Sequence, residues 1–136
     1  RFWAGATGAV FARLASATAL DKSSVAWPTL GLSATLPVEF ANLASGRRFE
    51  VFFVARMAQS NGSSEVSALY ASRQAGNSGW QSFQLKPDFE LYKFHYDVNP
   101  VEGGYTNGPM IVFHSDASGG GKSVEFLGMY VKALPK

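Results

Sequence analysis

The stretch FELYKFHYDV, residues 89–98, alternates between apolar and polar side chains more regularly than any other part of the chain. In an extended strand, its side chains would form two sets on opposite faces: Tyr92, Phe94, Tyr96 and Val98 on one, and Lys93, His95 and Asp97 on the other. Because successive side chains of a strand point to opposite sides, this pattern predicts a strand with one buried and one solvated face.

Similar stretches lie on both sides of this strand. RFEVFFVARM at 48–57 is rich in aromatic and β-branched residues and is followed by the turn-forming SNGS at 60–63. Further strands are expected at 65–70, 80–85, 110–115 and 123–132, with less regular ones at 10–14 and within 29–38. About seven short strands separated by turns, without a strongly amphipathic helix, predict an all-β protein, an antiparallel β-sandwich.

Length and composition predict one folded domain spanning residues 1–136. That length is typical of a single domain, and 46% hydrophobic against 16% charged residues argues against disorder. The net charge is +2 with no basic cluster, so binding to nucleic acid is not expected. No apolar run approaches the ~20 residues that span a bilayer, so membrane insertion is not expected. Since the sequence opens at Arg1 without a signal peptide, we expect residues 1–20 to connect to a larger parent protein.

Motifs that would carry catalysis fail on their spacing. GGGKS at 119–123 is like the end of a phosphate-binding loop, but Asp116 stands where the first glycine is needed and a strand is expected to follow. His114, Ser115 and Asp116 are consecutive, so on a strand they alternate between faces and form no relay. The acidic residues are scattered, and nothing pairs two of them as a glycosidase requires. We therefore expect no enzymatic activity.

Metal ligands are also scarce in this sequence. There is no cysteine, which excludes disulfides and thiolate metal sites, and there are two histidines. His95 and His114 could meet on neighbouring strands, but an ordinary hydrogen-bonded role for each is the stronger hypothesis. No metal site and no cofactor are predicted.

The aromatic content, with 3 Trp, 5 Tyr and 11 Phe, exceeds what turns and strand edges require. Sugar rings carry an apolar face of C–H groups that stacks on an aromatic ring, while polar side chains bind the hydroxyl groups. Trp80 is the first candidate for such stacking because it follows NSG at 77–79, where a loop ends. The predicted ligand-binding residues are Trp80, Arg56, Tyr70, Lys93, His95 and Tyr105. The competing interpretation places most rings in the core and leaves the polar groups simply solvated.

From about residue 48 to the C-terminus, the order of features resembles the galactose-binding-like jelly rolls, particularly non-catalytic carbohydrate-binding modules. The resemblance rests on these segments: FEVFFVAR at 49–56, WQSF at 80–83, FELYKFHY at 89–96, IVF at 111–113, a glycine-rich turn, and VEFLGMYV at 124–131. It implies a jelly-roll fold and glycan binding. The closing strand lacks the acidic pair often found near the end of such modules, so the family-type calcium site is not expected, although a structural calcium ion stays open.

The N-terminal stretch RFWAGA at 1–6, followed by GAVFA at 8–12, resembles segments of tailed-phage fibre and tail-tip attachment proteins. There such a segment introduces a terminal receptor-binding domain. The resemblance implies a virion tail as the location, a cell-surface glycan or polysaccharide as the partner, and a homotrimeric fibre as the parent. Multivalency in such a fibre would raise a weak single-site affinity.

Two alternatives stay open at this point. One is a carbohydrate-binding module of a secreted, hence extracellular, polysaccharide-degrading enzyme. The other is a structural virion or fibre domain without a ligand. Glycan binding predicts an exposed aromatic platform with polar neighbours, whereas the structural alternative predicts that protein contacts cover the exposed apolar surface.

Overall fold

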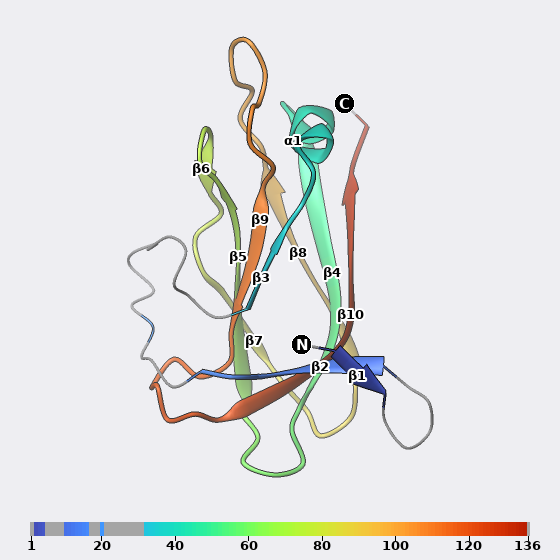
Figure 1. Ribbon diagram of the computed structural model, residues 1–136, viewed down its shortest axis with the longest axis vertical. Coiled ribbons are helices and arrows are strands. Elements are labelled where there is room, and N and C mark those ends of the chain that lie inside the picture. Colours follow the sequence, from blue (N-terminus) through green and yellow to red (C-terminus); the bar gives the residue numbers. More distant parts are fainter. Residues whose placement is uncertain (1, 5–9, 17–19, 21–31, 136) are drawn as a thin grey trace.

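The computed structural model of the chain describes residues 2–4, 10–16, 20 and 32–135, whose strands form two antiparallel sheets packed face to face (Figure 1). Sheet A contains, in order, β1 (Phe2–Ala4), β2 (Val10–Ala15), β10 (Ser123–Ala133), β4 (Arg48–Met57) and β8 (Glu90–Asp97). Sheet B contains β3 (Leu32–Thr35), β9 (Met110–His114), β5 (Glu65–Ser72) and β6 (Gly76–Asn77), with β7 (Gln81–Gln84) also paired to β5. The predicted all-β antiparallel sandwich is thereby confirmed.

Strand β8 has the two faces that its alternation predicts. Phe94 is buried, and Tyr92 and Tyr96 are half-buried against the core, whereas Lys93 and His95 are exposed. The neighbouring strand β4 also has an inner and an outer face, although its sequence is too rich in apolar residues to show the alternation clearly. Its inner face consists of these buried residues: Phe49, Val51, Phe53 and Ala55.

An aromatic cluster around Phe53 joins the two sheets. Its ring lies 5.1 Å from that of Phe113 and 5.2 Å from that of Phe83, both in sheet B, and 5.4 Å from that of Tyr92 in sheet A. These separations are those of favourable edge-to-face and stacked aromatic pairs. The inner faces therefore make a continuous core that fixes how the sheets sit on each other.

A β-bulge in β10 decides which side chains that strand turns outward. Its pairing with β4 runs from Phe126 opposite Ala55 directly to Gly128 opposite Val54, so Leu127 is an extra residue. Because one extra residue reverses every later side chain, Met129 and Val131 pack on the core. The bulge thus places Tyr130 on the outer face, where it is 62% exposed.

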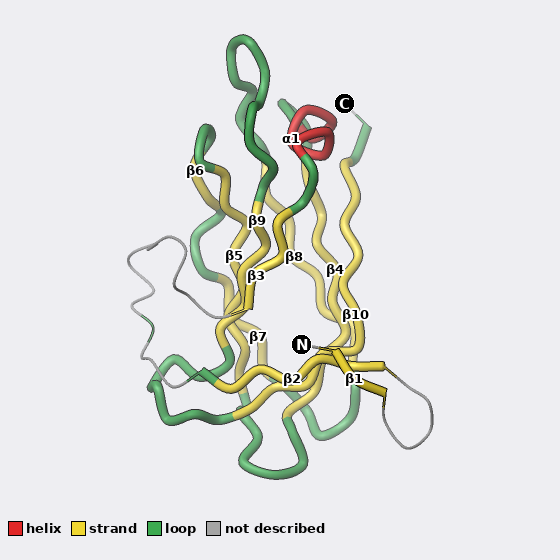
Figure 2. The backbone as a smooth tube through the Cα atoms, viewed as in Figure 1, coloured by secondary structure: helices red, strands yellow, loops and turns green. Residues whose placement is uncertain are grey.

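One short helix, α1 (Val38–Ala44), lies at the end of the sandwich (Figure 2) and begins at the last residue of the range 29–38, in which a strand was expected and β3 is found. It follows Pro37, which has the extended backbone of a residue preceding a helix, and it buries Ala41 and Ala44. The Asn42 side chain accepts a hydrogen bond from the Tyr105 amide at 2.9 Å and donates one to the Tyr105 carbonyl at 3.3 Å. A helix of seven residues is too short to be stable alone, so these tertiary contacts stabilise it.

The N-terminal strands β1 and β2 extend sheet A beyond β10, within the residues 1–20 for which a connection to a parent protein is expected. Residues 1, 5–9 and 17–19 of that segment lie outside the described part, and the connection itself stays a prediction. Among the helices that the structure describes, none has the length and apolar character needed to cross a membrane.

Candidate functional site

The outer face of sheet A presents side chains from three adjacent strands in regular cross-strand rows. One row is Leu91, Val54 and Gly128, the next is Lys93, Phe52 and Tyr130, and the third is His95, Glu50 and Lys132. Directly opposite side chains in an antiparallel sheet lie close enough to interact. The rows therefore form one continuous surface built by β8, β4 and β10.

The first two rows carry an apolar surface that water still reaches. We call Phe52, Val54, Leu91 and Tyr130 the platform. Leu91 is 65% and Tyr130 62% exposed, and both are among the large hydrophobic side chains most exposed in the described chain. The Phe52 and Tyr130 rings lie 5.8 Å apart at an angle of 44°, so they present a shallow aromatic surface rather than a packed stack.

Two lysines flank the platform, and one carboxylate holds both. Glu50 binds Lys93 through Oε2 at 3.6 Å and Lys132 through Oε1 at 3.8 Å, and its side chain is only 12% exposed. The two ammonium groups lie 5.8 and 5.9 Å from the centroid of the Phe52 ring, within the range of cation–π attraction. Aromatic carbon and charged hydrogen-bond donors are therefore side by side at the centre of this face.

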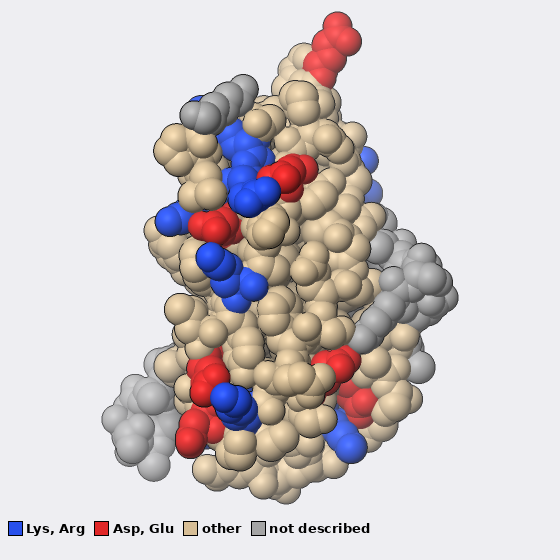
Figure 3. Space-filling view, turned by 180° about the vertical axis from the view of Figure 1, so that it is seen from behind, with Lys and Arg blue, Asp and Glu red and all other residues tan. Residues whose placement is uncertain are grey.

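Charged pairs border the platform at both ends. Arg48 donates to both carboxylate oxygens of Asp97, and this hydrogen bond lowers the pKa of Asp97 and raises that of Arg48. At the other end, Arg56 donates to Glu125 at 2.9 Å while its guanidinium lies 4.2 Å from the centroid of the Phe89 ring. Seen from behind, basic and acidic side chains intermix in an upper and a lower group with uncharged surface between them (Figure 3).

The outer face of sheet B is of a different kind. Leu69 and Val112 stand opposite each other on β5 and β9 and are 1% and 6% exposed. Trp80, the first candidate for stacking on a sugar ring, lies on this face, where it is half-buried and packs with Met110 against these two side chains. Trp80 therefore contributes to a small apolar cluster, on the sheet opposite Lys93 and His95.

Two of the predicted ligand-binding tyrosines lie in the core. Tyr70 has 0% exposure and packs on the rings of Phe49 and Tyr96, and burial raises the pKa of its hydroxyl well above the usual value. Tyr105 is 5% exposed, and its hydroxyl donates a hydrogen bond to the carbonyl of Asn99. Neither ring offers a face to a ligand. Of the six predicted residues, Arg56, Lys93 and His95 lie on the outer face of sheet A, with Arg56 at the end of the face away from Lys93 and His95.

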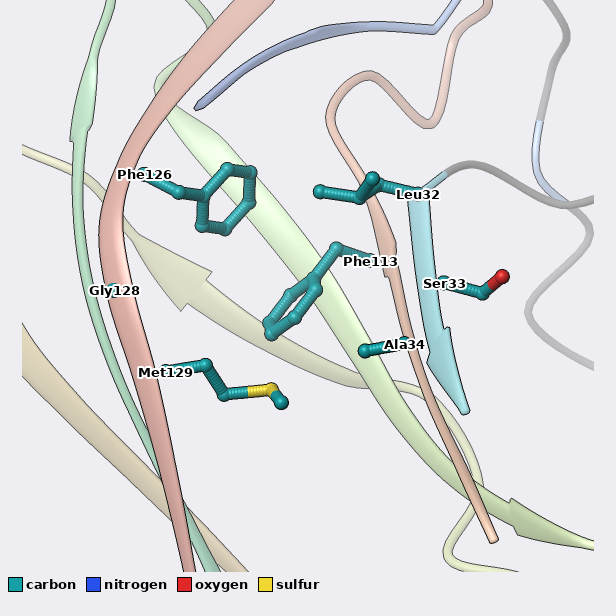
Figure 4. A pocket seen from close by; sticks show the side chains of 7 residues that line it. All are labelled: Leu32, Ser33, Ala34, Phe113, Phe126, Gly128 and Met129. Carbon is teal, nitrogen blue, oxygen red and sulfur yellow. The ribbon is translucent and has the colours of Figure 1, made fainter. Parts of the chain in front are cut away.

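A cavity of about 140 Å³ opens between β3 and β10, where the two sheets are not joined. The side chains of Leu32, Ala34, Phe126 and Met129 point into it, whereas the hydroxyl of Ser33 points away (Figure 4). Sugar recognition needs polar groups converging on the ligand together with apolar surface. This apolar cavity does not meet that requirement, and the outer face of sheet A does.

The hypothesis that His95 and His114 meet on neighbouring strands is wrong, because β8 belongs to sheet A and β9 to sheet B. His114 is buried, and its Nδ1 accepts the backbone N–H of Asp116 at 3.3 Å. Within the described residues, no group of three or more His, Cys, Asp or Glu side chains could hold a metal ion.

The segment after β9 is a closed polar turn. Asp116 accepts hydrogen bonds from the Ser118 amide and hydroxyl and from the Lys122 amide, and the Ser118 bond lowers the pKa of its carboxyl. Ser115 bonds to the Ser16 hydroxyl and the Lys122 carbonyl rather than to His114. Strand β10 follows this segment, so its glycines form a turn, as the sequence predicts. The hydrogen bonds of Ser115 and Asp116 do not connect them with His114 in the order of a catalytic relay.

Sequence reasoning missed Phe52, Leu91 and Tyr130 as members of this surface. For Phe52, the signal was present in the alternation of β4, where Phe52 and Val54 share the face of Arg56. For Tyr130 it was not, since strict alternation from Phe126 would turn Tyr130 inward and only the bulge turns it outward.

No family model and no curated protein matches this chain. Solved structures do match. The match to a structure described as "CBM4 structure and function" covers 98% of this chain and 77% of the other chain, with a TM-score of 0.59 and 14% sequence identity. The match to another, described as "EclA C-terminal domain; sugar-binding protein", covers 96% of this chain and 89% of the other chain, with a TM-score of 0.55 and 10% sequence identity. At these identities the likeness establishes a shared β-sandwich fold.

Proposed function

We propose that this chain is a non-catalytic glycan-binding module whose binding surface is the outer face of sheet A. The observation that carries the proposal is the platform itself: an exposed tyrosine and a half-buried phenylalanine flanked by two lysines held at one carboxylate. The description of the EclA structure as a sugar-binding protein and of the other neighbour as a CBM4 domain supports the same function.

The chemistry of the platform suits a sugar better than a purely apolar ligand. A pyranose stacks its C–H face on Tyr130 and Phe52 and so removes apolar surface from water. Its hydroxyl groups at the rim meet donors on Lys93, in the same row as the two rings, and on Lys132 and His95 in the next row. Apolar contact and polar rim are thus supplied by the same three strands.

The parent that we propose is a tailed-phage receptor-binding protein, with the module at the end of a trimeric fibre on the virion tail and a cell-surface polysaccharide as its partner. The likeness of the opening RFWAGA stretch to attachment proteins supports this parent. A carbohydrate-binding module of a secreted polysaccharide-degrading enzyme is the second candidate, because one structural neighbour is described as a CBM4 domain. Both parents use the same binding face.

A glycan array that includes bacterial surface polysaccharides tests the proposal, with Tyr130→Ala as the decisive variant. We expect the wild-type chain to bind at least one glycan and Tyr130→Ala to weaken that binding at least about fivefold, because a central aromatic contact contributes upwards of roughly 1 kcal/mol. Leu43→Ala is the matched control, since Leu43 is 50% exposed but lies on α1. It should bind like the wild type.

Trp80→Ala decides between the two sheets. Binding that survives Tyr130→Ala and disappears in a folded Trp80→Ala protein would move the site to sheet B. If the folded wild-type chain binds no glycan, the structural alternative, in which protein contacts cover the platform, takes its place.

A further inference from the structure

We infer that the platform selects acidic glycans, and that Lys93 and Lys132 together bind an anionic substituent of the sugar that stacks on Phe52 and Tyr130. This inference rests on the proposed function and adds the class of ligand. The anionic substituent is a carboxylate, sulfate or phosphate, since each presents oxygen acceptors to ammonium donors.

The charge balance of the face carries the inference. Three ion pairs around the platform join one base to one acid: Arg48 to Asp97, Arg56 to Glu125 and Lys86 to Glu90. At Glu50, by contrast, two lysines share one carboxylate. One positive charge is therefore in excess at the side of the platform where Lys93 and Lys132 lie, close to the Phe52 ring.

Burial places that excess charge where a ligand can reach it. The Glu50 side chain is 12% exposed, whereas those of Lys93 and Lys132 are 54% and 46% exposed. The carboxylate thus holds both ammonium groups from the protein side and leaves their outer sides to solvent. An anion on a stacked sugar would meet both lysines without displacing Glu50.

The position of the lysines ties the anion to the sugar ring. Lys93 and Lys132 stand on the strands at either side of β4, and both ammonium groups lie within 6 Å of the Phe52 ring centroid. A polyanion such as DNA gains its affinity from neutralising many phosphates at once. A single excess charge beside two aromatic rings instead fits one charged group on a stacking ligand.

The test compares matched acidic and neutral polysaccharides by isothermal titration or biolayer interferometry. Polygalacturonate is set against its carboxyl-reduced form, and dextran sulfate against dextran, so that the two arms separate carboxylate from sulfate. We expect at least one acidic member to bind more tightly than its neutral partner, with the difference shrinking as salt screens the charges.

Variants locate the effect. Lys93→Gln and Lys132→Gln should each weaken acidic binding roughly threefold to fivefold more than neutral binding, because the amide of Gln still donates to sugar hydroxyl groups and only the charge is lost. Lys86→Gln is the control, because it removes the same charge from a lysine that is 67% exposed and pairs with Glu90 outside the platform.

The outcomes separate this inference from the proposed function. If acidic and neutral glycans bind equally and Tyr130→Ala weakens both, the glycan-binding face stands and the acidic preference is overturned. An acidic preference that Lys93→Gln and Lys132→Gln leave intact also overturns it. If no polysaccharide binds to the folded chain in either this experiment or the array, both proposals fail.

Discussion

On the outer face of sheet A, Leu91 is 65% exposed, whereas on the outer face of sheet B, Leu69 is 1% exposed. Both are leucines on strands and both point away from the shared core. Sheet B packs its outward side chains into a second apolar cluster with Val112 and Trp80, while sheet A leaves Leu91 and Tyr130 in water. An outer face whose apolar groups are already buried contributes to stability, and one whose apolar groups stay exposed is available to a partner.

The largest effect expected from this comparison is on stability. Leu69→Ala should lower the free energy of unfolding by about 2–5 kcal/mol, because it removes a buried side chain and leaves a cavity. Leu91→Ala should change it by less than about 0.5 kcal/mol, as is usual for an exposed position. Urea denaturation of the two variants measures both values, and similar losses would mean that the outer faces do not differ in the way described.

A smaller loss of stability is expected from removing the Asp116 carboxylate, which lies in the turn between β9 of sheet B and β10 of sheet A. Asp116→Ala should cost about 1–3 kcal/mol, since it deprives the Ser118 and Lys122 donors of their acceptor in a closed turn. Denaturation at pH 7 of this variant, compared with the wild type, measures the cost. An unchanged midpoint would show that the turn does not depend on this carboxylate.

The pH dependence of Asp116 follows from its lowered pKa. A carboxyl whose pKa is lower in the folded than in the unfolded chain stabilises the fold above its unfolded pKa of about 3.9, and this contribution is lost as the pH falls through the folded value. The stability difference between wild type and Asp116→Asn should therefore be largest near neutral pH and shrink below about pH 4. A stability difference that increases on acidification would contradict the lowered pKa of Asp116.

The smallest effect is expected for the exposed pair of Arg48 and Asp97 on sheet A. The Arg48 hydrogen bond lowers the pKa of Asp97, but both side chains are largely in water, where salt screens their attraction. Asp97→Asn should therefore change stability little at low salt and not measurably at high salt. Thermal melts at two ionic strengths check this, and a loss insensitive to salt would show that the pair is more enclosed than its exposure indicates.

Much of this comparison could be predicted for sheet A and little for sheet B. The alternation at 89–98 placed Lys93 and His95 outward correctly, because a half-buried strand shows its two faces in its sequence. Strand β5 has an apolar or small residue at nearly every position and buries both faces, so its sequence does not say which of Leu69 and Tyr70 faces the shared core.

The remaining differences arise from contacts between distant residues. The bulge at Leu127 reverses the direction of Tyr130, and a local pattern gives no sign of it. Tyr105 lies in a segment rich in glycine and proline, yet it is buried because Asn42, on a helix far away in sequence, binds its backbone. The position of Trp80 at the end of a loop predicts stacking on a ligand, but its side chain packs on strands that precede and follow it.

The central claim, that sheet A presents the glycan-binding face, is tested most directly by methyl NMR of the chain during titration with the tightest glycan found on the array. We predict that the Leu91 and Val54 methyl signals shift with saturation, because these side chains belong to the platform, while those of Leu69 and Val112 stay in place. Shifts confined to Leu69 and Val112, with Leu91 and Val54 unchanged, would contradict the account.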